Sequence, residues 1–349
     1  MKKFFLLGLV LFSLPLAAWG QEPAGFITKQ SAGLDLAIWY PLGGLDHGPY
    51  PLVIFSHGYS GCNVQTLYFT EELSRQGYVV AAPNHHDSKC ATDAQGDLNE
   101  FKTEKFLEPE RWSAETYFDR RQDLVATIDQ LLRENRDPTS QFYNLINPSQ
   151  IGIAGHSLGG YTALGMAGAR PTWHDNRVKA VVAFSAFIGP YIISETLDQI
   201  KIPVMYQSGT LDRNGSTADQ VYDLTRAPKV SMVLKASTHM AWSNVLCLLK
   251  KTDECLATNR RAQTINQFAI SFFDRYLKGD ATAEKNFTTK TALIDSLQFD
   301  LSSPKAPSES ATTTPDTESP TSSRPLLLVI LLIAVLFGLN KFLTKKLTN

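Results

Sequence analysis

The stretch IGIAGHSLGG, residues 151–160, constrains the fold of this chain more than any other. An apolar, β-type run ends there in Gly155-x-Ser157-x-Gly159, and the small-residue segment LGGYTALGMAGA that follows is typical of a closely packed helix. Glycines on both sides of the serine remove the Cβ atoms that would block a tight turn between a strand and a helix. A serine on such a turn projects its hydroxyl above the sheet, which predicts that Ser157 is a nucleophile. The alternative is that the glycines only make the turn.

The pattern between residues 21 and 301 places this turn in an α/β domain. The segments that read as strands are GFITKQ, LDLAIWYPL, PLVIFSHG, YVVAAPN, QIGIAGHS, VKAVVAFSA, IPVMYQSGT and KVSMVLK. Helical patterns cover residues 63–76, 111–136, 158–169, 217–226 and 259–278, and a polar loop covers 85–110. Because strands alternate with helices, we expect a mostly parallel sheet of about eight strands with helices on both faces, in which the first two strands form an antiparallel pair.

A serine nucleophile needs a general base and an acidic residue that orients the base. In a strand–turn–helix site of this type, the acid and then the histidine follow the serine along the chain. Only His174 and His239 come after Ser157, and His174 follows too soon, so His239, after the strand KVSMVLK, is the predicted base. Asp212, at the end of the preceding strand, is the predicted acid, and Asp219, inside a predicted helix, is the reserve. The alternative for His239 is a structural loop histidine.

The oxyanion formed in such a reaction needs two backbone N–H groups. One is expected from Leu158, directly after the nucleophile, and the other from Tyr59 in the turn His57-Gly58-Tyr59 after the strand PLVIFSHG. His57 itself is expected to be structural rather than a base. Trp242, three residues after the predicted base, either lines the acyl pocket or packs in the core.

Two further groups of polar residues are interpreted as structural. The segment NHHDS contains His85, His86 and Asp87, but adjacent residues at a strand end point to opposite sides and bind one ion poorly. We expect them to be structural or to line the pocket, with a metal site as the alternative, and we predict no metal and no other cofactor. Three charged residues of the helix 111–136 are expected in surface or sheet-edge salt bridges: Arg120, Arg121 and Asp123.

The first twenty residues predict export from the cytoplasm. In MKKFFLLGLVLFSLPLAAWG two lysines precede an apolar run that small residues close, as in a secretory signal peptide cut before Gln21. An uncleaved N-terminal anchor is the alternative. Four cysteines fit an oxidising compartment, and the absence of a Cys-x-x-Cys pattern argues against zinc. We expect two disulfides, with free buried thiols as the alternative: Cys62–Cys90 and Cys247–Cys255.

The C-terminal part of the sequence differs from the domain 21–301 in composition. Residues 302–324 are mostly serine, threonine and proline, which predicts a disordered linker. Residues 325–343 are almost entirely apolar and predict a transmembrane helix, and the lysines near its end place the tail 344–349 in the cytoplasm. The domain is then expected on the periplasmic or extracellular side of the cytoplasmic membrane. A cleaved sorting signal is the alternative.

The order of the motifs along the chain resembles that of the α/β-hydrolases. FSHGYSG, GYVVAAPNHHDS, RRQDLVATIDQLL, GHSLGG, SGTLD and STHMAW occur in that order within about residues 25–280. The chain resembles the dienelactone-hydrolase-like and platelet-activating-factor-acetylhydrolase-like branch, and also the cutinase and polyester hydrolase group. It differs from dienelactone hydrolases, which use cysteine in place of Ser157, and from polyester hydrolases, which often have Trp and Met in place of His156 and Leu158. The resemblance implies that the ring of Tyr59 contacts substrate.

Together these features predict a serine carboxylic-ester hydrolase that acts outside the cytoplasm, through an acyl-enzyme, on small or lipid-derived esters. The alternatives are an acetylhydrolase- or phospholipase-like esterase in lipid degradation, a cutinase-like polyester hydrolase, an amide or peptide hydrolase, and a noncatalytic binding module. A net charge of −1 gives no indication of nucleic-acid binding, and no obligate protein partner is evident.

Overall fold

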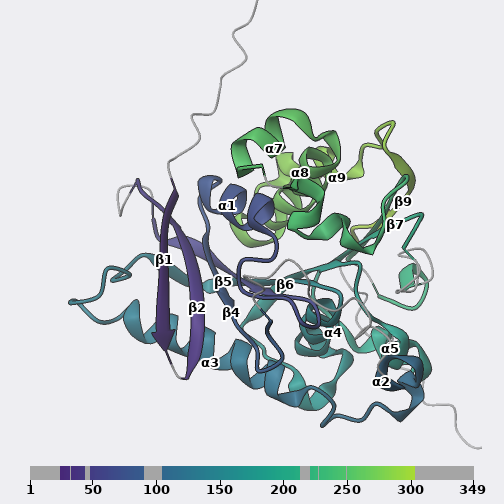
Figure 1. The fold of residues 1–349 in the computed structure, drawn as a ribbon, viewed down its shortest axis with the longest axis horizontal. Helices are drawn as coiled ribbons and strands as arrows, with labels where there is room; N and C mark the ends of the chain where they lie inside the picture. Colours follow the sequence, from purple (N-terminus) through teal and green to yellow (C-terminus); the bar gives the residue numbers. More distant parts are fainter. Residues whose placement is uncertain are drawn as a thin grey trace, which may run out of the picture. The chain divides into compact units, whose positions relative to one another are not determined.

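One continuous sheet of nine strands forms the centre of the molecule (Figure 1). The computed structural model describes residues 24–31, 33–43, 48–89, 104–212, 221–226, 228–248 and 250–302, which belong to one compact unit. The strands are β1 (Ala24–Ser31), β2 (Leu34–Pro41), β3 (Tyr50–Ser56), β4 (Val79–Pro83), β5 (Ile146–His156), β6 (Val178–Phe184), β7 (Val204–Gly209), β8 (Lys229–Leu234) and β9 (Ile294–Asp300). The α-helices of the described residues are α1 (Leu67–Arg75), α2 (Glu104–Leu107), α3 (Phe118–Glu134), α4 (Leu158–Leu164), α5 (Gly189–Ile193), α7 (Thr252–Thr258), α8 (Arg260–Phe273) and α9 (Glu284–Thr288).

The strand order is β1-β2-β4-β3-β5-β6-β7-β8-β9. The six strands from β4 to β8 pair in parallel, whereas β1, β2 and β9 pair antiparallel at the two edges. The predicted mostly parallel sheet is therefore confirmed, as is the antiparallel pair at its start. The strand β9 was not predicted, because a half-exposed edge strand carries too few apolar residues to stand out in the sequence.

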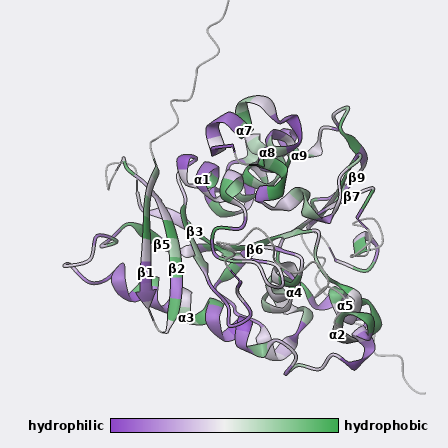
Figure 2. Ribbon diagram, viewed as in Figure 1, coloured by the Kyte–Doolittle hydropathy of each residue, from purple (hydrophilic) through white to green (hydrophobic). Residues whose placement is uncertain are grey.

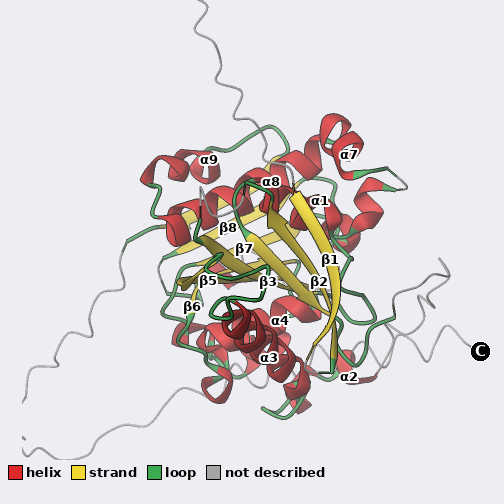
Figure 3. Ribbon diagram, turned by 90° about the vertical axis from the view of Figure 1, so that its left-hand side faces the viewer, coloured by secondary structure: helices red, strands yellow, loops and turns green. Residues whose placement is uncertain are grey.

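Helices cover both faces of the sheet (Figure 3). α1, α7, α8 and α9 lie on one face and share one apolar core with it, and α3, α4 and α5 lie on the other face with a second core. Strand β3 is buried along its whole length, as expected for a strand covered on both sides. In α3 the side chains of Leu124, Ile128 and Leu131 face the core, while its outer face is hydrophilic (Figure 2).

Two predicted helices begin later than expected. α1 starts at Leu67 rather than at residue 63, and α3 starts at Phe118 rather than at residue 111. Tyr117 has a positive φ of 61°, which breaks the helical path, and a short 3₁₀ turn over Pro109–Arg111 precedes it. The predicted polar loop 85–110 contains the short helix α2, and its residues 90–103 lie outside the described residues.

Several predictions fall on parts of the chain that the structure does not describe. These are the signal peptide 1–20, the linker 302–324 beyond its first residue, the transmembrane helix 325–343 and the tail 344–349, together with Asp219 and Cys90. Within the described ranges no helix is long and apolar enough to cross a bilayer. The structure joins Cys247 to Cys255 in a disulfide with a Cα–Cα distance of 5.3 Å. The Cys62–Cys90 pair stays a prediction.

Candidate active site

Ser157 forms the corner between β5 and α4. β5 ends at His156 and α4 begins at Leu158, and the corner residue has φ 54° and ψ −117°. This conformation is strained for a residue with a side chain and persists only where the surroundings enforce it. A Cβ on Gly155 would overlap the Gly159 carbonyl, and a Cβ on Gly159 would overlap the main chain at the end of β3. The two glycines therefore allow the close approach that the turn requires.

His239 and Asp212 meet at the same edge of the sheet. Asp212 follows β7, and His239 opens the 3₁₀ helix η7 (His239–Trp242) after β8. His239 Nδ1 lies 3.1 Å from Asp212 Oδ1, and both side chains are buried. Because Nδ1 faces a carboxylate, it carries the proton, and Nε2 of the neutral ring is an acceptor. The structure thus brings together the predicted base and acid.

His156 connects the residues around this pair. Its Nε2 donates to the His239 carbonyl at 2.9 Å, and the two imidazole rings lie 4.7 Å apart. Its Nδ1 accepts from Gln65 Nε2 at 2.7 Å, and Gln65 Oε1 accepts from the Gly58 N–H at 2.7 Å. Burial, and then the neighbouring His239, lower the pKa of His156 to about 3, so this link stays neutral. It joins the loop of the predicted base to the turn that carries Tyr59.

Ser185 is a residue of this site that the sequence analysis missed. It follows β6, which lies between β5 and β7, and its Oγ donates to Asp212 Oδ2 and lies 3.1 Å from His239 Nδ1. Its backbone has a positive φ of 46°. Its position after a predicted strand was the only indication in the sequence, because the carboxyl ends of neighbouring parallel strands meet at one edge of a sheet. The single serine in VVAFSA belongs to no recognisable motif.

The two predicted oxyanion donors flank Ser157. A Cβ placed on Gly58 would lie 3.3 Å from Ser157 Cβ, so the turn Gly58–Tyr59 adjoins the nucleophile candidate. Among the described residues, neither the N–H of Tyr59 nor that of Leu158 has a hydrogen-bond acceptor. Two N–H groups without a partner beside a serine are the elements of an oxyanion site.

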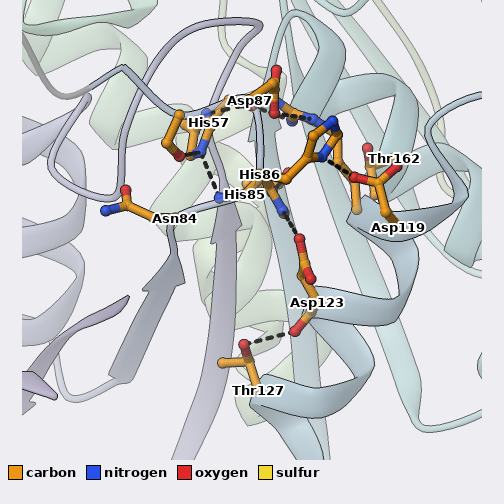
Figure 4. A network of polar contacts seen from close by, with 12 residues as sticks. His57, Asn84, His85, His86, Asp87, Asp119, Asp123, Thr127 and Thr162 are labelled. Carbon is orange, nitrogen blue, oxygen red and sulfur yellow. Dashed lines mark hydrogen bonds and ion pairs between the residues drawn. The ribbon is translucent and has the colours of Figure 1, made fainter. Parts of the chain in front are cut away.

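Behind this turn lies a buried group of polar residues (Figure 4). His85 Nδ1 pairs with Asp123 Oδ2 at 2.8 Å, and its Nε2 lies 2.9 Å from Ser56 Oγ. His57 Nε2 accepts from the His85 N–H at 3.1 Å. Burial, and then the charge of Arg120, lower the pKa of both histidines, that of His57 to about 3. His57 is thus a neutral structural residue, as the sequence predicted.

The segment NHHDS does not converge on one point. His85 turns inward to Asp123, whereas His86 is exposed and pairs with Asp119 (Figure 4). Asp87 turns to Arg120 instead. Across the described ranges no group of three or more His, Cys, Asp or Glu side chains is arranged to hold a metal ion.

Arg120 corrects one expectation of the sequence analysis. It was expected in a surface or sheet-edge salt bridge, but it is fully buried. Its guanidinium pairs with Asp87 at 2.9 Å and donates to the carbonyls of His57 at 2.7 Å and Gly58 at 3.1 Å. The helical pattern of residues 111–136 does not distinguish a buried arginine from an exposed one, whereas in the structure the turn and the Asp87 carboxylate supply the partners of the guanidinium.

Trp242 packs in the core and does not line the site. Its side chain is fully buried in the core shared with α1 and α8, and its Nε1 donates to Gln207 Oε1 at 3.1 Å. No surface of the ring is left for an acyl chain. The prediction of a pocket residue at this position is therefore replaced by the core alternative.

Aromatic side chains form a wall beside Ser157. The ring centroids of Tyr59 and Phe106 are 5.3 Å apart, those of Phe106 and Phe187 5.1 Å, and those of Trp112 and Phe187 4.9 Å. The Phe187 N–H donates to the Ser157 carbonyl at 3.0 Å, which fixes this wall next to the strained corner. The wall is apolar and suits an apolar ligand group.

Comparisons with known proteins agree with this geometry. Residues 43–130 match the family described as platelet-activating factor acetylhydrolase, isoform II. The chain is 26% identical over 147 residues to Esterase YjfP of Escherichia coli (strain K12), and 21% identical over 248 residues to Cutinase est1 of Thermobifida alba. These alignments cover 42% and 70% of this chain, and 50% and 65% of the respective relatives, so the chain spans only about half to two thirds of their length.

The segment that matches the acetylhydrolase family contains β3, the turn with Tyr59, β4 and most of α3. The cutinase alignment extends over a larger part of the domain. The sheet order, the strained corner at Ser157 and these matches support the resemblance of the chain to the α/β-hydrolase superfamily, in its acetylhydrolase- and cutinase-like branch.

Proposed function

We propose that the chain is a serine carboxylic-ester hydrolase with Ser157 as nucleophile, His239 as general base and Asp212 as the orienting acid. The observation that carries the proposal is the buried His239–Asp212 pair at the edge of the sheet where Ser157 occupies its strained corner. The esterase and cutinase names of the two relatives support the reaction class.

The reaction follows from the hydrogen bonds of the site. Because His239 Nδ1–H is held by Asp212, Nε2 accepts the proton of Ser157 as its Oγ attacks the ester carbonyl. The tetrahedral oxyanion receives the N–H groups of Tyr59 and Leu158. His239 then returns the proton to the leaving alcohol as its C–O bond breaks, and an acyl-enzyme remains. Water, activated by His239, attacks the acyl group and releases the acid.

The aromatic wall favours esters with an apolar acyl or alcohol group. Tyr59, Phe106 and Phe187 offer ring faces and edges beside the serine. Small and lipid-derived esters fit this description. An acetylhydrolase-like lipid esterase and a cutinase-like polyester hydrolase are narrower forms of the same proposal, supported by the family match and by the cutinase relative.

We further propose that the enzyme is exported and anchored in the cytoplasmic membrane by residues 325–343. The signal-like start and the apolar C-terminal segment of the sequence support this arrangement. In spheroplasts, or in cells that have no outer membrane, an added protease should remove the domain and leave the tail 344–349 protected. Protection of the domain would contradict the proposal.

The reaction class is tested with p-nitrophenyl esters from acetyl to long-chain acyl and with the matching anilides. We expect ester hydrolysis without comparable anilide hydrolysis, and a loss of more than about 10⁴-fold in kcat for Ser157→Ala. Reaction with a fluorophosphonate probe separates an enzyme from a noncatalytic module. Unchanged ester hydrolysis by Ser157→Ala, or a folded protein that reacts with neither esters nor probe, would overturn the proposal.

A further inference from the structure

One peptide unit beside Ser157 determines where an oxyanion donor points. The Gly58 carbonyl and the Tyr59 N–H belong to the same planar trans peptide, so they point in opposite directions and rotate together. A Cβ on Gly58 would lie 3.3 Å from Ser157 Cβ, which places this peptide next to the nucleophile. Whatever fixes the Gly58 carbonyl therefore also fixes the direction of the Tyr59 N–H.

Three donors converge on that carbonyl. His57 Nδ1 donates to the Gly58 oxygen at 2.7 Å, the Gly61 N–H at 3.0 Å and Arg120 Nη2 at 3.1 Å. Arg120 Nη1 also donates to the preceding carbonyl, that of His57, at 2.7 Å. Two consecutive carbonyls of the turn are thus held by one guanidinium. His57 and Gly61 belong to the turn itself, whereas Arg120 reaches it from α3, a separate and rigid element.

The remaining face of the guanidinium is held by Asp87. Arg120 Nε and Nη2 donate to the two oxygens of this carboxylate at 3.1 Å and 2.9 Å. Burial of Asp87 raises its pKa, but the charge and hydrogen bonds of Arg120 lower the pKa by more, so the carboxylate stays ionised. A planar guanidinium with partners on both sides has a fixed orientation, and a lysine ammonium cannot reproduce that geometry.

We infer that Arg120, oriented by Asp87, is a positioning residue that fixes the Gly58–Tyr59 peptide so that the Tyr59 N–H points at the oxyanion. The inference rests on the proposed ester hydrolase function. Arg120 touches no reacting atom, and its influence on the rate passes through the Tyr59 N–H. Because the donor matters most when the carbonyl oxygen becomes charged, its loss affects kcat more than KM.

The kinetic test compares Arg120→Lys with Arg121→Lys, the same substitution one residue further along α3. Arg121 donates to the Trp173 carbonyl at 3.5 Å, and this contact does not involve the turn His57-Gly58-Tyr59. Loss of a complete oxyanion donor costs about 10²- to 10³-fold in kcat, so a misdirected one should cost about 10- to 100-fold. We expect this loss in Arg120→Lys with KM within about twofold, and wild-type kinetics in Arg121→Lys.

Two ketone inhibitors distinguish positioning from general damage. A trifluoromethyl ketone forms a tetrahedral oxyanion adduct with the active serine, whereas the methyl ketone of the same chain binds without forming one. In Arg120→Lys the inhibition constant of the trifluoromethyl ketone should rise by the factor by which kcat/KM falls, and that of the methyl ketone should not change. Wild-type kcat and inhibition in a folded Arg120→Lys would overturn the inference, as would equal weakening of both ketones.

Amide hydrogen exchange gives a readout that does not depend on activity. The Gly58 N–H donates to Gln65 Oε1 and the Gly61 N–H donates to the Gly58 carbonyl, so the exchange of both reports whether the turn is held. We expect the N–H groups of Gly58 and Gly61 to exchange faster in Arg120→Lys but not in Arg121→Lys. Exchange in α8 should be unchanged in both variants. Unchanged exchange in the turn of Arg120→Lys would overturn the inference. If the wild-type protein hydrolyses no ester, the proposed function fails, and the exchange result still decides whether Arg120 holds the turn.

If Arg120→Lys does not fold, Asp87→Asn takes its place. The asparagine keeps the volume and leaves the arginine in place but removes the charge that orients it. We expect a smaller change of the same kind, with kcat and the trifluoromethyl ketone affected together and KM preserved. A folded Asp87→Asn protein with wild-type kcat and wild-type exchange in the turn would contradict the inference.

Discussion

The buried neutral histidines should make the protein sensitive to mild acid. Burial lowers the pKa of His57 and of His156 to about 3, with further lowering by Arg120 and His239 respectively. In the unfolded chain both histidines have the ordinary pKa of about 6.5. Below that pH the unfolded state binds more protons than the folded state, so the free energy of unfolding falls as the pH falls from about 6.5 towards 3.

The size of the effect follows from the two pKa values. Between pH 7 and pH 5, a histidine whose pKa falls from 6.5 to about 3 on folding lowers the free energy of unfolding by about 2 kcal/mol. His57 and His156 together account for about 4 kcal/mol, and His85, whose pKa is lowered for the same reason, acts in the same direction. Against a typical total of 5–15 kcal/mol, such a loss is large.

Urea unfolding followed by tryptophan fluorescence at several pH values between 7.5 and 5 measures this loss. His156→Gln keeps a donor for the His239 carbonyl but binds no proton, so its free energy of unfolding should fall by about 2 kcal/mol less over the same range. His174→Gln makes the same substitution at an exposed histidine outside this buried site and is the control. Equal unfolding free energies at pH 7 and pH 5 would refute the reasoning.

Three further changes have defined outcomes. Gly159→Ala places a Cβ onto the main chain at the end of β3, so we expect the free energy of unfolding to fall by about 1–3 kcal/mol and most of the activity to be lost. A wild-type melting temperature and a wild-type kcat would contradict the packing argument. Ser185→Ala removes a hydrogen bond to the predicted acid, and we expect about a tenfold lower kcat at unchanged KM in steady-state kinetics, whereas an unchanged kcat would exclude the role. Replacing Cys247 and Cys255 by serine removes a disulfide with a sequence separation of 8. The free energy of unfolding measured in urea should fall by about 2.5 kcal/mol, and an unchanged value would argue against the disulfide.

The sheet and the corner could be predicted because their signals are local. Apolar runs that alternate with helical patterns determine the layers, and the glycines around Ser157 are needed for a turn that no other residues permit. Chain order then selected His239 and Asp212, since the carboxyl ends of parallel strands meet at one edge. The strand β9 lacked such a signal, because the three apolar residues of IDSLQFD form neither an apolar run nor a regular alternation.

The remaining features depend on contacts between distant segments. Arg120 has its partners 33 and 63 positions away in the sequence, and nothing around it predicts burial. Ser185 enters the site only because β6 lies between β5 and β7. Trp242 could have faced either side of its loop, and only the packing against α1 and α8 decides that it belongs to the core.

The most direct test of the account is to identify the residue that becomes acylated. The protein is mixed with a slowly hydrolysed ester or a fluorophosphonate, quenched, and digested, and the modified peptide is sequenced by mass spectrometry. The account predicts one covalent adduct, on Ser157, which is absent from Ser157→Ala and forms much more slowly in His239→Gln. An adduct on another residue, or turnover of ester without an acylated Ser157, would contradict it.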